Sequence, residues 1–183
     1  MKNFSLDREK TLFLFVDIQD KLLAAIDNRE EVLKNSKILA QMVSIMNINS
    51  MITVQYPKGL GYTNNSIKEF LKDTEEIEKK SFSCMLNDEF KKKISDSGKS
   101  QVVLCGIEAH ICVLLTARDL IKAGYEVFIA SDAIGSRSKF NYKNAMSQLK
   151  EMGCVLSNVE SIMFDLNSVA GTEEFKSVQK LIL

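Results

Sequence analysis

One cysteine of this chain stands where a thiol can act as a nucleophile. An apolar run, residues 102–105, ends at Gly106, and a helical pattern begins soon afterwards, so Cys112 is expected in the first turn of a helix. That turn carries backbone N–H groups without intrahelical partners and the positive end of the helix dipole. Both features favour the thiolate, which is the nucleophilic form. Cys112 could equally be a small apolar side chain buried after a strand.

An aspartate ends another apolar run and could accept the thiol proton. Residues 11–17 read TLFLFVD and place Asp17 at the end of a strand. In a parallel sheet the carboxyl ends of the strands meet at one edge, where active sites gather. Asp17 and Cys112 therefore suit a proton acceptor and its nucleophile. A structural alternative stays open, because Asp17 could instead cap a short helix that starts near Asp20. For Asp132, at the end of a later strand, a capping role is favoured.

Strand and helix patterns alternate along the chain and would position these residues. The expected strands are residues 11–17, 51–56, 101–105, 126–131 and 154–157. The expected helices are residues 32–48, 114–123, 140–152, 159–166 and 172–181. The chain has no internal repeat, low-complexity tract or linker, so residues 1–183 are expected to form a single α/β domain with a mainly parallel central sheet.

Composition narrows the classes of partner. The 183 residues are 45% hydrophobic and 26% charged, which is ordinary for a globular protein, and the formal net charge is zero. Zero net charge disfavours nucleic acid as a partner. No apolar run is long enough to cross a bilayer, and the N-terminal segment lacks a signal-peptide core. The four cysteines have no metal-finger spacing, so we expect a cytoplasmic protein with free thiols and no membrane partner.

Several segments together resemble one family. FVDIQDKL (15–22) resembles the first-strand motif of the isochorismatase-like cysteine hydrolase superfamily, which includes nicotinamidases and N-carbamoylsarcosine amidase. GIEAHICV (106–113) resembles its nucleophile motif, and EKKSFS (78–83) its lysine motif, whose spacing selects Lys79 over Lys80. With these, QYPKGLG (55–61) and SDAIGSRS (131–138) look most like the isochorismatase domain-containing subgroup. The resemblance implies a three-layer α/β/α sandwich with Rossmann-like topology.

The resemblance also implies a set of catalytic groups. Cys112 would attack a carbonyl carbon, Asp17 would act as general acid–base, and Lys79 would keep the aspartate ionised. The oxyanion hole would consist of the backbone N–H groups of Glu108 and Cys112. A non-proline cis peptide bond would join Ile107 to Glu108. Without the resemblance, Lys79 would read as part of a solvated charge run.

Other residues are expected around this site. Substrate-binding positions are Gln19, which could instead face solvent, together with Tyr56, Phe82 and Ile111. His110 is the only histidine and lies two residues before the cysteine. Residues two apart on a helix do not face each other, so we expect a structural or pocket-rim role for His110 rather than that of the base. Cys84 follows the lysine motif and is expected to be partly exposed.

The expected activity is hydrolysis of a C–N bond in a small amide or ureido compound through a Cys acyl-enzyme. Isochorismatases cleave a vinyl ether, and some do so without the cysteine that this chain has. The loop YPKGLGYTNNS (56–66) lacks the Asp and His that hold a metal in many nicotinamidases, so no metal and no cofactor are expected. A homo-oligomer is expected, a dimer or higher. The alternative is a non-enzymatic oligomeric binding or scaffold protein with a vestigial site.

Overall fold

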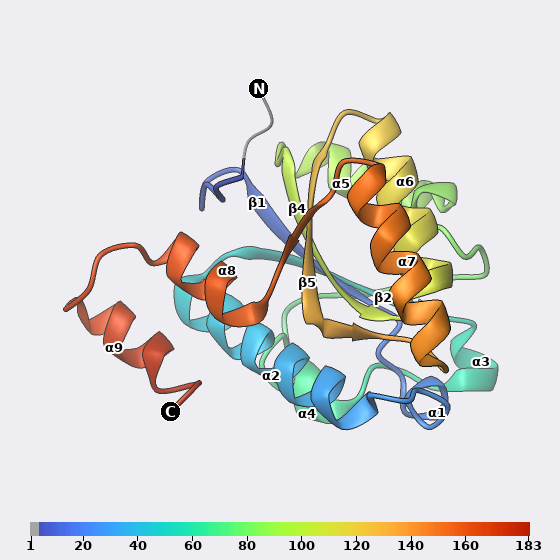
Figure 1. Ribbon diagram of the computed structural model, residues 1–183, viewed down its shortest axis with the longest axis horizontal. Helices are drawn as coiled ribbons and strands as arrows, with labels where there is room; N and C mark the ends of the chain where they lie inside the picture. The colour runs from blue at the N-terminus through green and yellow to red at the C-terminus, as the bar shows by residue number, and fades with distance from the viewer. Residues whose placement is uncertain (1–3) are drawn as a thin grey trace.

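A six-stranded parallel sheet forms the centre of the molecule in the computed structural model, which describes residues 4–183 (Figure 1). Its strands are β1 (Thr11–Val16), β2 (Asn49–Gln55), β3 (Glu76–Lys79), β4 (Gln101–Ile107), β5 (Glu126–Gly135) and β6 (Val155–Ser157). Their order across the sheet is β3-β2-β1-β4-β5-β6, and every neighbouring pair is parallel. The predicted α/β class is therefore confirmed.

Helices cover both faces of this sheet and make three layers. One face carries α2 (Arg29–Met46), α8 (Val159–Leu166) and α9 (Glu173–Gln179), and the other α5 (Asp88–Asp96), α6 (Leu114–Lys122) and α7 (Lys139–Glu151). Short helical segments lie in the connections: α1 (Asp20–Leu23), α3 (Pro57–Leu60), α4 (Asn65–Lys68), η1 (Cys84–Leu86) and η2 (Ala109–Val113). This arrangement confirms the three-layer sandwich.

The unbroken apolar run of β1 follows from burial on both sides. Phe13 and Phe15 belong to the core cluster beneath α2, whereas Leu12 and Leu14 belong to the cluster beneath α5, α6 and α7. Successive side chains of a strand point to opposite faces, so a strand covered twice needs apolar residues at every position. The same rule accounts for the apolar residues that follow Gln101 in β4, all of which are buried.

Two elements of the sheet region escaped the sequence analysis. The strand β3 (Glu76–Lys79) and the helix α5 lie in a stretch rich in charged residues. The sequence of β3 looks polar because β3 is an edge strand that buries only alternate side chains, Ile77 and Lys79. The expected helix at 32–48 begins earlier, at Arg29, and ends at Met46, since Asn47 adopts the left-handed conformation of a C-cap. Of the N-terminal segment, residues 1–3 lie outside the described residues.

The strand order determines where chemistry can occur. From β1 the chain runs to β2 and β3 on one side, and then returns to place β4 on the other side of β1. Ligands of open α/β sheets bind at the carboxyl ends of the strands where the order reverses. At this switch point Gly106 lies against the end of β1: a Cβ there would stand 2.1 Å from the carbonyl oxygen of Val16. Only glycine lets the two strand ends approach this closely.

None of the helices in the described part of the chain has the length and apolar character needed to cross a membrane.

Candidate active site

Asp17 is the first residue after β1 and is completely buried. Its backbone is in the left-handed region, with φ of 52°, and its N–H donates to the carbonyl of Thr53 on the neighbouring strand. The hydroxyl of Thr53 in turn donates to Asp17 Oδ1 at 2.8 Å. The carboxylate is thus directed to the switch point. Asp17 does not cap α1, because the N-cap residue of that helix is Gln19 and no side chain forms a cap hydrogen bond there.

Lys79 ends β3 and reaches the same place from two strands away. Its ammonium donates to Asp17 Oδ2 at 2.6 Å, and neither side chain has exposed surface. The same nitrogen lies 3.7 Å from Cys112 Sγ. The structure therefore brings together the three residues that sequence motifs selected, although they are up to 95 positions apart in the chain.

Cys112 does not lie in the first turn of an α-helix, as expected, but in a π-helical turn, Ala109–Val113, that precedes α6. The expectation of a thiolate favoured by its surroundings is also wrong. Burial and the neighbouring Asp17 charge raise the pKa of the Cys112 thiol, and the positive charge of Lys79 opposes them only in part. The raised pKa favours the protonated thiol over the thiolate at neutral pH.

Lys79 is charged at neutral pH despite its burial. Burial, the largest single influence, would lower the pKa of Lys79, but the charge and hydrogen bond of Asp17 together with the neighbouring Cys84 and Cys112 outweigh it, and the net shift is upward. A buried ion pair is tolerated only where its geometry is good and further hydrogen bonds satisfy both partners. Thr53 on the carboxylate and Gln55 on the ammonium supply those bonds.

The peptide bond between Ile107 and Glu108 is cis, at the position where the family resemblance places one. The Glu108 carboxylate is nearly buried and is bound by the guanidinium and the backbone N–H of Arg137, in the turn after β5. Burial would raise the pKa of Glu108, but these Arg137 contacts more than offset it and hold that pKa below its usual value. The Glu108–Arg137 pair therefore ties the loop that carries Cys112 to the turn after β5.

His110 is directed away from the thiol. Its Nδ1 lies 3.0 Å from the hydroxyl of Ser136, and its Nε2 lies 3.3 Å from the side-chain nitrogen of Asn141. Both ring nitrogens are therefore occupied by neighbours from the β5–α7 region. This placement agrees with a structural role for the histidine rather than that of the base.

The four expected substrate-binding residues occupy different environments. Gln19 has no exposed surface, and its amide joins the end of β2 to Gly61 through hydrogen bonds, so it cannot line a pocket. Tyr56 is half exposed at the end of β2. Phe82 is exposed, and its carbonyl oxygen, not its ring, lies 3.5 Å from the ammonium of the site. Ile111 packs, partly buried, against the core beneath α6.

A cavity of about 650 Å³ opens beside the ion pair. Lys79 contributes to its wall together with Tyr56 and Leu86, and the remaining lining residues are Pro57, Lys58, Glu78, Lys80, Ser81 and Asn87. A small molecule fits such a volume. This cavity is therefore the candidate substrate site.

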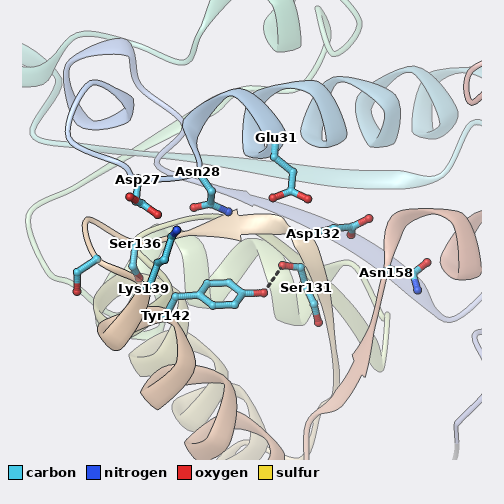
Figure 2. A pocket seen from close by; sticks show the side chains of 10 residues that line it. Asp27, Asn28, Glu31, Ser131, Asp132, Ser136, Lys139, Tyr142 and Asn158 are labelled. Carbon is cyan, nitrogen blue, oxygen red and sulfur yellow. Dashed lines mark hydrogen bonds between the residues drawn. The ribbon is translucent and has the colours of Figure 1, made fainter.

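A second cavity, of about 330 Å³, lies between the start of α2 and the start of α7 (Figure 2). Figure 2 shows Asp27 and Glu31 on one side and Lys139 and Tyr142 on the other, with the Tyr142 hydroxyl donating to the carbonyl of Ser131 at 2.7 Å. None of the expected site residues lines it. Asp132, at its edge, accepts a hydrogen bond from the first N–H of α8, which agrees with the expected structural role.

Sequence reasoning missed two polar side chains of β2. Thr53 and Gln55 hold the carboxylate and the ammonium of the ion pair. The available signal was their place at the carboxyl end of a strand beside the one that ends in Asp17. Cys84 differs from expectation as well: it is fully buried, its sulfur lies 3.7 Å from the hydroxyl of Thr53, and burial raises the pKa of its thiol to about 11.

The donor set does not suit a resident metal. Over residues 4–183, no group of three or more His, Cys, Asp or Glu side chains is placed to hold a metal ion. At the site itself, a lysine ammonium already binds the Asp17 carboxylate beside the thiol. That no metal or cofactor takes part stays a prediction.

The isochorismatase domain model matches residues 11–161, most of the described sheet. The chain belongs to the isochorismatase family. Isochorismatase domain-containing protein 2 of Danio rerio is 37% identical over 178 residues, which cover 97% of this chain and 89% of that protein. The secreted isochorismatase effector Isc1 of Phytophthora sojae is 34% identical, covering 92% and 83% respectively. The resemblance to the family and to the domain-containing subgroup is thereby confirmed.

A solved structure agrees with this assignment. The MAR1 ribonuclease of Caenorhabditis elegans superposes with a TM-score of 0.91 at 33% identity, covering 97% of this chain and 92% of that chain. The fold is therefore shared with a relative whose name describes a different substrate from that of an amidase. The chain is a member of a hydrolase family, and its own reaction has to be argued from its site.

Proposed function

We propose that this chain is a cysteine hydrolase that cleaves the C–N bond of a small amide or ureido compound. One observation carries the proposal: a buried lysine ammonium stands 2.6 Å from Asp17 and 3.7 Å from Cys112, so base, cation and nucleophile form one contiguous group. A scaffold protein gains nothing from a buried ion pair beside a thiol, because such pairs contribute little to stability.

The reaction proceeds in two steps. Cys112 Sγ bonds to the carbonyl carbon while its proton passes to Asp17; the C–N bond then breaks, and the leaving nitrogen takes the proton from Asp17 as ammonia or an amine departs. Water next gives a proton to Asp17 and attacks the thioester carbon; the C–S bond then breaks, the acid is released, and Asp17 returns the proton to Cys112 Sγ, which restores the thiol. The raised pKa of Cys112 fits this order, because the proton stays on sulfur until the base removes it.

Charge develops on the carbonyl oxygen in both steps and requires donors that are already in place. We assign this role to the backbone N–H groups of Glu108 and Cys112. Lys79 keeps Asp17 ionised between proton transfers. Tyr56, at the rim of the cavity, would contact the part of the substrate that does not react.

The decisive experiment is release of ammonia or amine from a panel of small amides and ureides, with wild type compared with Cys112→Ala. Intact-mass spectrometry after rapid acid quenching should show a thioester adduct on Cys112 in wild type alone. An amide whose hydrolysis persists in Cys112→Ala would contradict the acyl-enzyme. Failure of every compound, with Cys112 inert, would favour the scaffold alternative with a vestigial site.

RNA belongs in the same panel because the relative from Caenorhabditis elegans is named as a ribonuclease. Balanced charge still makes nucleic acid the less favoured substrate. Cleavage of RNA that is lost in Cys112→Ala would replace the amide proposal. Cleavage that survives that change would indicate a contaminating nuclease.

We also propose that the chain acts as a cytoplasmic homo-oligomer. None of the four cysteines, all within residues 4–183, forms a disulfide, which suits a reducing compartment, and large apolar side chains such as Tyr62, Phe82 and Leu86 are exposed near the cavity. Light scattering after size exclusion tests the oligomer, and a monomeric mass at micromolar concentration would contradict it. Because the relative from Phytophthora sojae is named as secreted, location needs fractionation of cells with an antibody to this chain.

A further inference from the structure

The path of Lys79 to the site crosses the end of another strand. β2 lies between β3 and β1, and Gln55, its last residue, stands in register beside Lys79. To reach Asp17 on β1, the lysine side chain must therefore pass over the end of β2. Gln55 stands on that path and meets the ammonium there.

The ammonium has three hydrogens and few near acceptors. The two close ones are Asp17 Oδ2 at 2.6 Å and Gln55 Oε1 at 2.7 Å. The carbonyl of Ser81 lies at 3.3 Å and that of Phe82 at 3.5 Å, so their contacts are weaker. Without Gln55 a single strong bond would hold the buried cation, and the ammonium could turn about it and away from the sulfur.

The amide of Gln55 is itself fixed. Its Nε2 donates to the carbonyl of Lys80 at 2.9 Å, which directs the oxygen toward Lys79. The backbone of Gln55 is clamped by Gln19, which accepts from its N–H at 2.7 Å and donates to its carbonyl at 3.0 Å. The buried Gln19, in the segment that follows β1, thus fixes the backbone of Gln55 at the point where Gln55 meets Lys79.

A neutral amide suits this place better than a carboxylate. A second carboxylate would compete with Asp17 for the ammonium and would oppose formation of the thiolate, since negative charge near Cys112 already raises the pKa of its thiol. An amide oxygen accepts the hydrogen bond without adding charge. It holds the cation while leaving Asp17 as the only anionic partner.

We propose that Gln55, braced by Gln19, is a positioning residue that holds the Lys79 ammonium between Asp17 and Cys112. Its catalytic consequence rests on the proposed cysteine hydrolase, but its effect on the thiol does not. A displaced ammonium stabilises the Cys112 thiolate less, so the thiolate forms less readily at any given pH.

The test is site-resolved alkylation of Cys112 by iodoacetamide across pH 7–10, in wild type, Gln55→Met, Lys79→Met and the double variant. Methionine keeps the length of the side chain and removes the acceptor. Gln55→Met should slow Cys112 alkylation about ten-fold and move its rise to higher pH. In the Lys79→Met background the same change should alter the rate by less than about two-fold, because the group through which Gln55 acts is gone. Gln148→Met, at an exposed position of α7, is the matched control and should react as wild type does.

Two outcomes overturn the proposal. One is a wild-type rate in folded Gln55→Met; the other is an equal loss in both backgrounds, which would indicate a general effect on packing. Since Lys79→Met removes one partner of a buried pair, a measurement that needs only Gln55→Met is added: titration of Lys79 by NMR with lysine labelled at 13Cε. Loss of an acceptor for the charged form lowers the pKa of Lys79, and an unchanged midpoint also overturns the proposal.

Alkylation needs no substrate, so failure of this proposal is distinct from failure of the proposed function. If the coupling between Gln55 and Lys79 appears while no amide is hydrolysed, the positioning role stands and the amidase does not. If amides are hydrolysed while Gln55→Met behaves as wild type, the amidase stands and the positioning role does not.

Discussion

Two polar regions at the carboxyl edge of the sheet treat charge in opposite ways. In the active-site region, Asp17 and Lys79 have no exposed side-chain surface and bind each other at 2.6 Å. In the second cavity, Asp27, Glu31 and Lys139 are exposed to solvent around a comparable hollow (Figure 2). Both regions hold carboxylates and a lysine, so composition does not separate them.

Desolvation separates them. Coulombic coupling between two charges is several-fold stronger in a protein interior than in water, so a buried cation can govern a neighbouring thiol and an exposed one cannot. In the cavity of Figure 2, the carboxylates of Asp27 and Glu31 and the ammonium of Lys139 are exposed, and no ion pair joins them among the described residues. We therefore expect substitutions in the two regions to differ in their effects on the free energy of unfolding and on hydrolysis.

Loss of the nucleophile should have the largest effect. Cys112→Ala should reduce hydrolysis of a responsive amide at least about 1,000-fold, because the acyl-enzyme cannot form. The measurement is the steady-state rate of ammonia release. Cys154→Ala, which changes another buried cysteine, is the control and should retain activity. Equal losses in the two variants would mean that Cys112 acts through folding alone.

A matched pair of lysine changes compares the two regions directly. Lys79→Met should lower the free energy of unfolding by about 3–5 kcal/mol, since it leaves the Asp17 carboxylate buried and unpaired. Lys139→Met, at the exposed cavity, should change it by less than about 0.5 kcal/mol. Urea unfolding followed by circular dichroism measures both. Similar values for the two lysines would remove the energetic distinction between the regions.

Alkaline pH should lower the stability of the folded state through the buried thiol of Cys84. Its pKa is raised from 9.0 to about 11 by burial, so between these values the folded state keeps a proton that the unfolded chain loses. The stabilisation is complete below pH 9 and is lost as pH rises toward 11, with a slope of about 1.4 kcal/mol per pH unit. The pKa of the buried Cys112 thiol is raised as well and adds to the total slope, so Cys84→Ser should reduce the slope between pH 9 and 10 by up to about 1.4 kcal/mol per pH unit without abolishing it, as measured by urea titrations.

Tyr142 of the second cavity supplies the control for that measurement. Burial and the nearby Glu31 and Asp132 charges raise the pKa of its phenol from 10.0, so the folded state keeps a proton that the unfolded chain begins to lose only near pH 9. Tyr142→Phe should therefore change the slope between pH 9 and 10 by less than Cys84→Ser does. A change as large as that of Cys84→Ser would show that the slope does not report the thiol.

The smallest effect is expected for Glu31→Gln. This exposed carboxylate of the second cavity should be replaceable with a change of less than about 0.5 kcal/mol in unfolding free energy and no change in Cys112 alkylation. Thermal unfolding and iodoacetamide labelling check both. A slower hydrolysis in Glu31→Gln would make the second cavity part of the functional site.

Much of the fold could be predicted from local pattern. The apolar runs of β1 and β4 and the helical spacing of α8 identify their elements, because burial on two faces or along one helix face leaves a periodic trace. The edge strand β3 could not be found that way. It buries only alternate residues and carries Glu78 and Lys79, so that its sequence resembles a solvated loop.

The sequence by itself determined the family and the class of fold and selected Asp17, Lys79 and Cys112 as candidates, since strand ends and motif spacing are local properties. Only the tertiary structure decided that Thr53 and Gln55 contact the ion pair and that burial raises the pKa of the Cys112 thiol. Both depend on which strands become neighbours and on how far water is excluded between them. Strand order and desolvation arise from contacts between distant segments, and no short stretch of sequence records them.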